Sequence, residues 1–533
     1  MGGTLPQGPT TQTGENGMKK PFAVVAALAL AAVLAVNAQA KTLKLALDAD
    51  PPRLDYMSQL SGNLLSYAEW TFDPLVRWTK DMKIEARLAE KWEQKDPLTM
   101  RVHLRKGVTF HSGNPFTAAD VKWTFDRIRK APDWKALYDA FKDVVIVDDH
   151  TVDFVFNRPE PLTLNLMTYI FPMDSKFYSG KDAAGKDKDL VSKTDPVFAN
   201  SNASGTGPFK VTSYEPQVKM VLDRSPAYWD KKSKGNVTQI VLTPIKNPGT
   251  RTAALLSGDV DFINPVNPQD QDLIKKEKGL ALVNMPSGRV ITFGFNPAVQ
   301  PEFKDVRVRQ AVIAAVNNAG IVDKIMNKLT VPANQFSAKG MSGYNDTLKG
   351  RFDVEKAKKL MKEAGYEKGF TVTMIAPNNR YTNDEKIAEA VAGMLAKINI
   401  KVDLKTMPIA QYWPEFQKRQ ASLQMVGWHP DTEDSANFFE FLAFCVDKEK
   451  GYGAYSSGFC DPKLDELVKS ASTETDLKKR DKILQNAEKM AYDEAAFIPL
   501  HYEPLSWAAK KNVKLETCIN QQNFLYLGDL VIE

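Results

Sequence analysis

The stretch FTVTMIAPNNRYTNDEKIAEAVAGMLAKINIKVDLKTM, residues 370–407, decides the fold class. Residues 371–376 are apolar and β-branched, and they predict a strand. Residues 383–398 place apolar side chains at helical spacing, and residues 400–404 predict a second strand. A strand, a helix and a strand in this order form the unit from which α/β sheets are built. The sequence therefore predicts a mixed α/β protein.

Two connections in this part of the chain place polar residues directly after predicted strands. The connection PNNRYT, residues 377–382, follows the first strand and contains Arg380. The connection GWHPD, residues 427–431, follows the apolar strand 423–426 and ends in Asp431. Open α/β sheets tend to bind ligands at the carboxyl ends of their strands. We therefore expect Arg380 and Asp431 to face one crevice.

Strand and helix signals also alternate in the rest of the chain. Residues 100–105 and 152–156 alternate apolar and polar side chains, as half-buried strands do. Between them TAAD, residues 117–120, resembles a capping box and predicts the start of a helix. Residues 354–364 have one apolar face, and Gly365 follows where a helix is expected to end.

The N-terminal residues have the pattern of a secretory signal peptide. MKK at residues 18–20 is basic, residues 22–36 are apolar, and AQA at residues 38–40 offers small side chains for cleavage. We expect cleavage after Ala40, so that the mature chain begins at Lys41 without a cysteine for a lipid anchor. A retained N-terminal anchor is the alternative.

The three cysteines agree with export. Cys445 and Cys460 flank a loop rich in Gly, Tyr and Ser, residues 451–458. A disulfide between them is favoured in an oxidising compartment and would stabilise the fold by roughly 3 kcal/mol. Two buried reduced thiols are the alternative. Cys518 is left over, and we expect it to be a buried free thiol.

Length and charge limit the possible functions. A chain of 533 residues is too long for one compact core and suits two or three lobes. The formal net charge is +5, and Lys residues are interleaved with Asp and Glu, so no basic face predicts a nucleic-acid partner.

The sequence lacks the common catalytic motifs. Neither HExxH nor GxSxG is present, and the five histidines have no close ligand spacing. Residues 180–187, GKDAAGKD, resemble the sequence of a phosphate-binding loop. Asp187, however, occupies the position at which Ser or Thr would bind magnesium. We therefore predict that the protein is not an enzyme and has no catalytic residue, metal site or cofactor. A hydrolase with scattered catalytic groups and a structural or adhesive surface protein are the alternatives.

Several motifs, taken in their order and spacing, resemble one known family. The chain is similar over residues 41–533 to the extracellular solute-binding proteins of family 5, which comprise oligopeptide-, dipeptide- and nickel-binding proteins of bacterial ABC importers. The motifs are FDPLV at 72–76, FHSG at 110–113, FTAADV at 116–121, GTGPF at 205–209, SPAYW at 225–229, ALLSGDVD at 254–261 and FKDVRVRQA at 303–311.

The resemblance implies a two-lobed periplasmic-binding-protein clamshell, type II like, with an extra subdomain in the first lobe. Residues 1–40 would be a leader and signal peptide. The first lobe would comprise residues 41–262, including the inserted subdomain, and the chain would return to it at 501–533. The second lobe would comprise residues 263–500.

The function implied by the resemblance is capture rather than chemistry. A periplasmic, soluble and monomeric protein without a lipid anchor would close over a small peptide or peptide-like solute. It would then deliver this ligand to the permease subunits of an ABC importer in the inner membrane. Binding of a metal chelate, an opine or a sugar is the alternative within the family, and a secreted hydrolase is the alternative outside it.

The resemblance also assigns roles to individual residues. Asp431, three places after Trp428, would hold a peptide amine, and Arg380 would bind the peptide carboxylate. Trp428 would form a wall of the site, and Ser61 and Gly62 resemble a ligand-facing loop of the first lobe.

Each of these assignments has a structural alternative. Arg380 could pair with Asp384 or Glu385 on its own helix, and Asp431 could end a turn. Trp428 could be a core aromatic residue. His429 is interpreted as a turn residue rather than a metal ligand, because a metal site needs several converging donors.

Overall fold

The computed structural model describes residues 1–3 and 41–533, except residues 136, 193, 431 and 448–451. The chain divides into two compact units, Met1–Lys41 and Thr42–Glu533, and the fold described below is that of the second unit. The predicted signal peptide and its cleavage site after Ala40 lie outside the described residues. No helix in the described part of the chain is long and apolar enough to cross a membrane.

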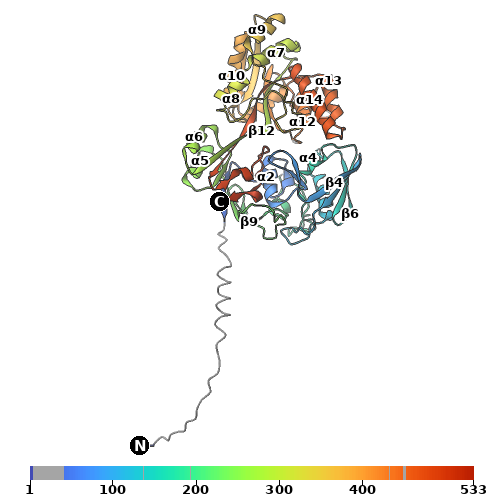
Figure 1. Ribbon diagram of the computed structural model, residues 1–533, viewed down its shortest axis with the longest axis vertical. Helices are drawn as coiled ribbons and strands as arrows, with labels where there is room; N and C mark the ends of the chain where they lie inside the picture. The colour runs from blue at the N-terminus through green and yellow to red at the C-terminus, as the bar shows by residue number, and fades with distance from the viewer. Residues whose placement is uncertain (4–40, 136, 193, 431, 448–451) are drawn as a thin grey trace. The chain divides into compact units, whose positions relative to one another are not determined.

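A large mixed sheet connects the two halves of this unit. Within the described residues it contains ten strands, in the order β14 (Lys401–Met407), β13 (Thr371–Pro377), β15 (Leu423–Trp428), β12 (Leu280–Phe295), β16 (Phe497–Lys510), β11 (Phe262–Asn264), β1 (Thr42–Leu47), β10 (Gln239–Pro244), β9 (Lys219–Arg224) and β8 (Phe209–Glu215). The long strands β12 and β16 pair antiparallel at its centre. Helices α8 (Asn318–Lys324), α9 (Val354–Glu363) and α10 (Asp384–Leu395) lie toward one end of β12 (Figure 1). Helix α2 (Gly62–Thr71) and strand β4 (Ala89–Asp96) lie toward the other end.

Smaller sheets accompany the large one. One antiparallel sheet packs on helix α3 (Ala118–Ile128). Its described strands are, in order, β4 (Ala89–Asp96), β5 (Thr99–Leu104), β7 (Thr151–Phe156) and β6 (Phe141–Asp148). In two further sheets β2 (Val76–Trp78) pairs with β3 (Ile84–Ala86), and β17 (Val513–Lys514) pairs with β18 (Val531–Ile532).

The helices of the described residues are mostly short. They are α2 (Gly62–Thr71), α3 (Ala118–Ile128), α4 (Thr163–Met167), α5 (Pro248–Ser257), α6 (Gln271–Lys276), α7 (Val306–Ala315), α8 (Asn318–Lys324), α9 (Val354–Glu363), α10 (Asp384–Leu395), α11 (Ile409–Lys418), α12 (Ser435–Phe438), α13 (Pro462–Ala471) and α14 (Leu477–Asp493).

The strand-helix-strand unit is confirmed. β13 and β14 pair in parallel, with Thr371 opposite Lys401, and α10 connects them. The helix begins one residue later than predicted because Asn383 adopts a left-handed conformation with φ 58°. The predicted helix end also differs, since Ala396–Ile398 forms a separate 3-10 turn.

The other predicted elements are also confirmed. Strands β5 and β7 cover the two segments of alternating polarity, and they pair antiparallel. Helix α3 starts with a capping box in which Thr117 and Asp120 satisfy each other's backbone N–H groups. Gly365, with φ 85°, follows the end of α9.

The buried hydrophobic residues fall into clusters that define two lobes. The largest cluster contains residues from Leu43 to Phe262 and again from Trp507 to Ile532. Two further clusters contain residues from Val290 to Tyr502. We call the parts built on the first cluster the first lobe and the parts built on the other two the second lobe. The late part of the chain therefore contributes to the core of the first lobe.

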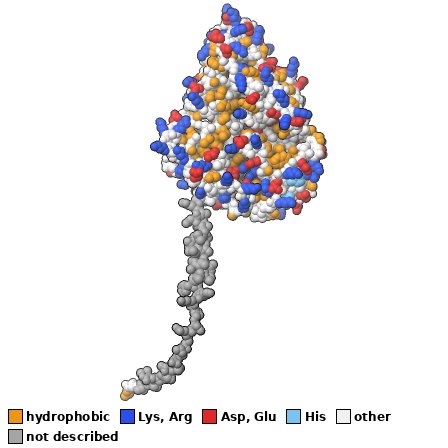
Figure 2. Space-filling model, in the orientation of Figure 1, with side chains coloured by type: hydrophobic (Ala, Val, Ile, Leu, Met, Phe, Trp, Pro, Cys, Tyr) orange, Lys and Arg blue, Asp and Glu red, His pale blue; other side chains and the backbone are white. Residues whose placement is uncertain are grey.

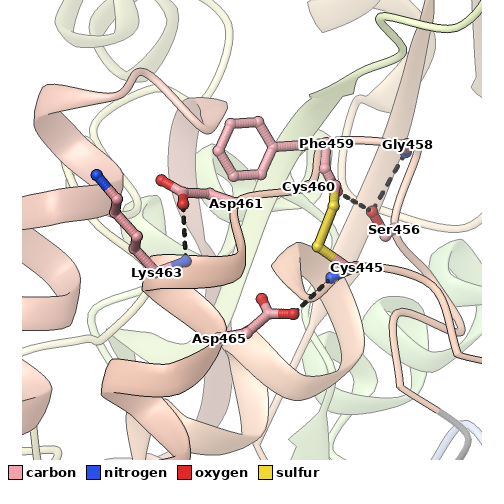
Figure 3. The surroundings of a disulfide bond; sticks show 8 residues. All are labelled: Cys445, Ser456, Gly458, Phe459, Cys460, Asp461, Lys463 and Asp465. Carbon is pink, nitrogen blue, oxygen red and sulfur yellow. Dashed lines mark hydrogen bonds between the residues drawn. A yellow bond between two sulfur atoms is a disulfide. The ribbon is translucent and has the colours of Figure 1, made fainter.

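The disulfide between Cys445 and Cys460 is confirmed (Figure 3). The backbone N–H of Cys445 donates to Asp465, and Asp461 next to the disulfide caps α13 by accepting from the N–H of Lys463. The bond thus fastens the loop to the first turn of α13. Cys518 is a buried free thiol, as predicted, and burial raises its pKa. Figure 2 shows acidic and basic side chains interspersed over the visible face.

Candidate functional site

A cavity of about 250 Å³ lies between the two lobes. On the first-lobe side it is lined by residues that follow strands β1 and β11, by helix α2 and by a late loop. On the second-lobe side it is lined by β12, β16 and the connection after β15. Its polar lining residues are Asp48, Ser66, Asn264, Ser287, Arg289, His429, Glu503, Gln521, Gln522 and Asn523. The cavity thus lies beyond the carboxyl ends of the parallel strands β1 and β11, where α/β sheets are expected to bind ligands.

An irregularity in β12 brings two side chains into this cavity. Pro286 pairs with Pro504 and Val290 with Tyr502, so the register between β12 and β16 shifts between these pairs. Such bulges re-aim side chains at functional sites. Ser287 and Arg289 lie in the shifted segment, and both line the cavity.

The glycine between these two residues has a steric role. A Cβ atom at Gly288 would collide with the side chain of Met341 and approach Nε2 of His429 to 3.2 Å. A larger residue at this position would therefore displace the side chain of Met341 and press on the ring of His429.

His429 contributes a neutral imidazole. Its Nδ1 lies 3.1 Å from the carbonyl of Pro430, and its side chain is 23% exposed. Burial and the neighbouring Arg289 lower the pKa of His429 to about 3. Its Nε2 lies 3.6 Å from Glu433 Oε1, and because the ring is neutral this contact is not an ion pair. The interpretation as a turn residue agrees with the bond to Pro430, but the ring also lines the cavity.

Glu503 connects the cavity to the connection after β13. Its Oε1 accepts hydrogen bonds from the backbone N–H and the hydroxyl of Thr382, both at 2.9 Å. Its Oε2 is buried without a hydrogen-bond partner among the described residues. One oxygen therefore holds the side chain in place while the other remains available at the cavity.

Further acceptors surround the same space. Gln521 Oε1, Gln522 Oε1 and Asn523 Oδ1 are also buried without a hydrogen-bond partner in the described part of the protein. An unsatisfied buried polar group costs about 1–3 kcal/mol. A ligand with several N–H or O–H donors would remove this cost. The charged lining residues comprise Asp48, Glu503 and Arg289, so the cavity can also bind groups of both signs.

Of the two predicted first-lobe residues, one lines this cavity. Gly62, in the first turn of α2, is one of its lining residues. Ser61 precedes it as the N-cap residue, and the Ser61 carbonyl accepts a hydrogen bond from the N–H of Leu65. The side chain of Ser61 makes no capping bond.

The predicted second-lobe residues are placed differently. Trp428 donates from Nε1 to Asn437 at 2.7 Å, and its ring stacks on Phe441 at a centroid distance of 4.7 Å. It is not a lining residue of the cavity, although the next residue is.

Arg380 is exposed and is not among the residues that line this cavity. Its backbone N–H donates to Asp384, and its guanidinium lies over the ring of Tyr381 at 5.3 Å. Asp431 lies outside the described residues. A shared crevice for Arg380 and Asp431 therefore stays a prediction.

Sequence reasoning did not find several lining residues. A signal existed for Asp48, which directly follows a strand, and for NQQN at 520–523, a run of amides within an apolar C-terminal stretch. Arg289 and Glu503 gave no local signal, because long-range strand pairing brings them to the cavity. No group of three or more His, Cys, Asp or Glu residues in the described ranges could hold a metal ion.

Comparisons with known proteins agree with this arrangement. The family model for bacterial extracellular solute-binding proteins, family 5 Middle, matches residues 83–450. The dipeptide-binding protein of Escherichia coli K12 is 29% identical over 93% of this chain and 96% of its own length.

Solved structures show the same two-lobed fold. HbpA2 from Haemophilus parasuis matches with a TM-score of 0.80 and 24% identity over 92% of this chain and all of that chain. DppA from Helicobacter pylori, in complex with the peptide STSA, matches with a TM-score of 0.69 and 24% identity, over 92% of this chain and 98% of that chain.

Proposed function

Because the chain belongs to the bacterial extracellular solute-binding proteins, family 5, we propose that it captures a small peptide or peptide-like solute and delivers it to the permease of an ABC importer. The observation that carries this proposal is the cavity between the lobes, with its buried unsatisfied acceptors. A peptide supplies donors in its ammonium and amide groups and an anionic group in its carboxylate. The name of the Escherichia coli relative, a dipeptide-binding protein, supports the same ligand class.

The size of the cavity favours a short ligand. Small-molecule sites commonly measure about 300–1,000 Å³. The cavity described above, which we call the polar cavity after its many polar lining residues, falls just below this range at about 250 Å³. It therefore suits the main chain of a dipeptide better than that of a long peptide.

Two hydrogen bonds between the lobes suggest how binding is coupled to closure. Asn165 Nδ2 in α4 donates to the carbonyl of Thr432 at 2.7 Å, and Gln522 Nε2 donates to Glu433 Oε1 at 2.9 Å. Both acceptors belong to the connection that follows β15. A ligand that contacts both lobes would favour this closed arrangement over an open one.

Our residue assignments follow from this proposal. Asp431 is the candidate for the ligand amine, since the nearby His429 lines the cavity. Arg380 is the candidate for the ligand carboxylate, and Trp428 and Ser61 flank lining residues.

We further propose how the protein is produced and organised. The signal peptide is cleaved after Ala40, and the mature protein is a periplasmic monomer without a lipid anchor. The chain passes from the first lobe to the second near residues 262/263 and returns near residues 500/501, and the protein binds its ligand without chemical turnover.

Mass spectrometry of the solute that co-purifies with the protein, followed by calorimetric titration with dipeptides, tests the function. We expect a di- or tripeptide-like solute to be released intact and dipeptides to bind stoichiometrically. Peptide cleavage during the titration, or no heat from any dipeptide, would contradict the proposal.

A further inference from the structure

A cavity of about 160 Å³ between the lobes brings two carboxylates together. The first lobe contributes Glu160, between β7 and α4, and the second lobe contributes Glu440, in the short π-helix Phe439–Ala443 that follows α12. None of the residues that line this space lines the polar cavity. We call it the carboxylate cavity.

Both lobes are needed to enclose the carboxylate cavity. Asn165 in α4 donates to the carbonyl of Thr432 at 2.7 Å, and Thr432 lines the cavity. The first lobe covers the space with apolar side chains, namely Leu137, Pro161, Leu162 and Leu166. When the lobes separate, this cover is withdrawn and both carboxylates regain contact with water.

The arginines that line the carboxylate cavity are committed to other partners. Arg158 pairs with Asp139 at 2.7 Å, and Arg480 pairs with Asp434 at 2.9 Å. Their positive charges therefore offset only part of the negative charge that the two glutamates bring to the cavity.

Neither glutamate of the cavity has an ion-pair partner in the described part of the chain. Glu160 accepts a hydrogen bond from the N–H of Leu162 at 2.9 Å. The backbone carbonyl of Glu440 accepts from the N–H of Gly453 at 2.7 Å, but its carboxylate accepts no hydrogen bond from the described residues. Enclosure of an unpaired carboxylate favours its protonated form, because burial penalises the charge.

The titration of both glutamates reflects this enclosure. Burial raises the pKa of Glu440 to about 7. The nearby carboxylates add to this effect, and the nearby guanidinium groups oppose it. Burial is likewise the main cause of the raised pKa of Glu160. The charged and titratable groups that face the pair are Arg158, Asp139, Asp434, Arg480 and Tyr452.

We propose that the carboxylate cavity makes lobe closure sensitive to pH, with Glu440 as the titrating group and Glu160 as the charge that faces it from the other lobe. In the closed arrangement the pKa of Glu440 is about 7, whereas a glutamate in water has a pKa of about 4.3. Closure therefore takes up a proton between these values. It is favoured as the pH falls from about 7 toward 4.3 and opposed above about pH 7. This inference rests on the proposed capture between closing lobes and adds its regulation.

The test compares Glu440→Gln with a matched control. Glu440→Gln keeps the size of the side chain and removes its titration, and Glu466→Gln makes the same change at an exposed position of α13. The full chain, freed of co-purified solute, is titrated calorimetrically at about pH 5.5 and about pH 7.5, on the two sides of the pKa of Glu440. The probe is whichever of Ala-Ala, Ala-Phe and Phe-Ala binds most tightly.

The wild type should bind the dipeptide roughly 5- to 20-fold more tightly at the acid pH, the upper value applying if Glu440 is fully hydrated in the open form. Glu466→Gln should show the same ratio. Glu440→Gln should bind with nearly the same affinity at both pH values, close to that of the acid wild type. Titration of the peptide itself contributes equally in all three proteins.

Glu160→Gln removes the facing charge and should reduce the wild-type ratio at least about twofold, so it decides the test if Glu440→Gln does not fold. The same ratio in the wild type and in every folded variant overturns the pH dependence of closure and leaves the proposed function intact. A wild type that binds none of the dipeptides overturns the proposed function. Small-angle scattering of the solute-free chain then decides the switch: a smaller radius of gyration at the acid pH in the wild type, but not in Glu440→Gln, supports it, and equal radii overturn it.

Discussion

Glu503 offers the sharpest test of the polar cavity. In Glu503→Gln the side-chain oxygen can still accept both hydrogen bonds from Thr382, at 2.9 Å each in the wild type. The amide NH2 group then takes the place of Oε2, so the substitution replaces the charged acceptor at the cavity by a donor and keeps the attachment of β16 to the connection after β13. A hydrogen bond with a charged partner contributes about 1.5–3 kcal/mol, and the amide NH2 group cannot accept a hydrogen bond from a ligand donor in its place.

The expected loss in Glu503→Gln is thus about 1.5–3 kcal/mol of binding free energy, or roughly 10- to 100-fold in Kd. The assay is calorimetric titration of the wild type and the variant with the co-purified solute, accompanied by thermal unfolding. Thr382→Val is the matched control, since it removes one of the two attachments and keeps the carboxylate; its affinity should fall less. Wild-type affinity in a folded Glu503→Gln variant would refute the assignment of Glu503 to the ligand.

Further predictions concern pH, covalent structure and the candidate site residues. The folded-state pKa of His429, about 3, lies below its ordinary value, so its contribution to stability is present above about pH 6.5 and is lost as the pH falls toward 3. His429→Gln should therefore lose less stability than the wild type between about pH 6.5 and 4, and parallel unfolding curves for the two proteins would contradict this. Replacing Cys445 and Cys460 by Ser should lower the free energy of unfolding by roughly 3 kcal/mol. Peptide mapping of the exported wild type should find an N-terminus at Lys41 and one alkylatable thiol, Cys518. Three alkylatable thiols would contradict the disulfide. Arg380→Ala and Asp431→Ala should each weaken binding roughly tenfold to a hundredfold and become insensitive to ligands blocked at the carboxylate or the amine respectively, whereas unchanged affinities would leave them as turn and helix-start residues.

The sequence predicted features that depend on local periodicity. The unit of β13, α10 and β14 was predictable because its strands and helix have their apolar residues at characteristic spacing. The disulfide was predictable because Cys445 and Cys460 flank one short loop, and export favours their oxidation. Gly62 at the polar cavity followed from the family resemblance.

The rest of the site depends on distant pairing. Arg289 reaches the polar cavity because β12 shifts its register against β16, and no local pattern specifies where this shift falls. Glu503 lies in β16, where most residues are apolar. The sequence of this segment therefore predicts a core strand and does not single out Glu503 as a site residue. Periodicity also predicted the strand before Arg380, which is β13, but Arg380 itself is exposed and does not line the polar cavity.

The lining of the polar cavity also has a consequence for biogenesis. Its walls come from Leu47 and Asp48 near the start of the folded unit and from Gln521 to Leu525 near its end. Contacts between such distant residues form late, since the intervening chain must first be ordered. The protein would thus be unable to hold its solute in this cavity until residues 521–525 have packed beside residues 47–48.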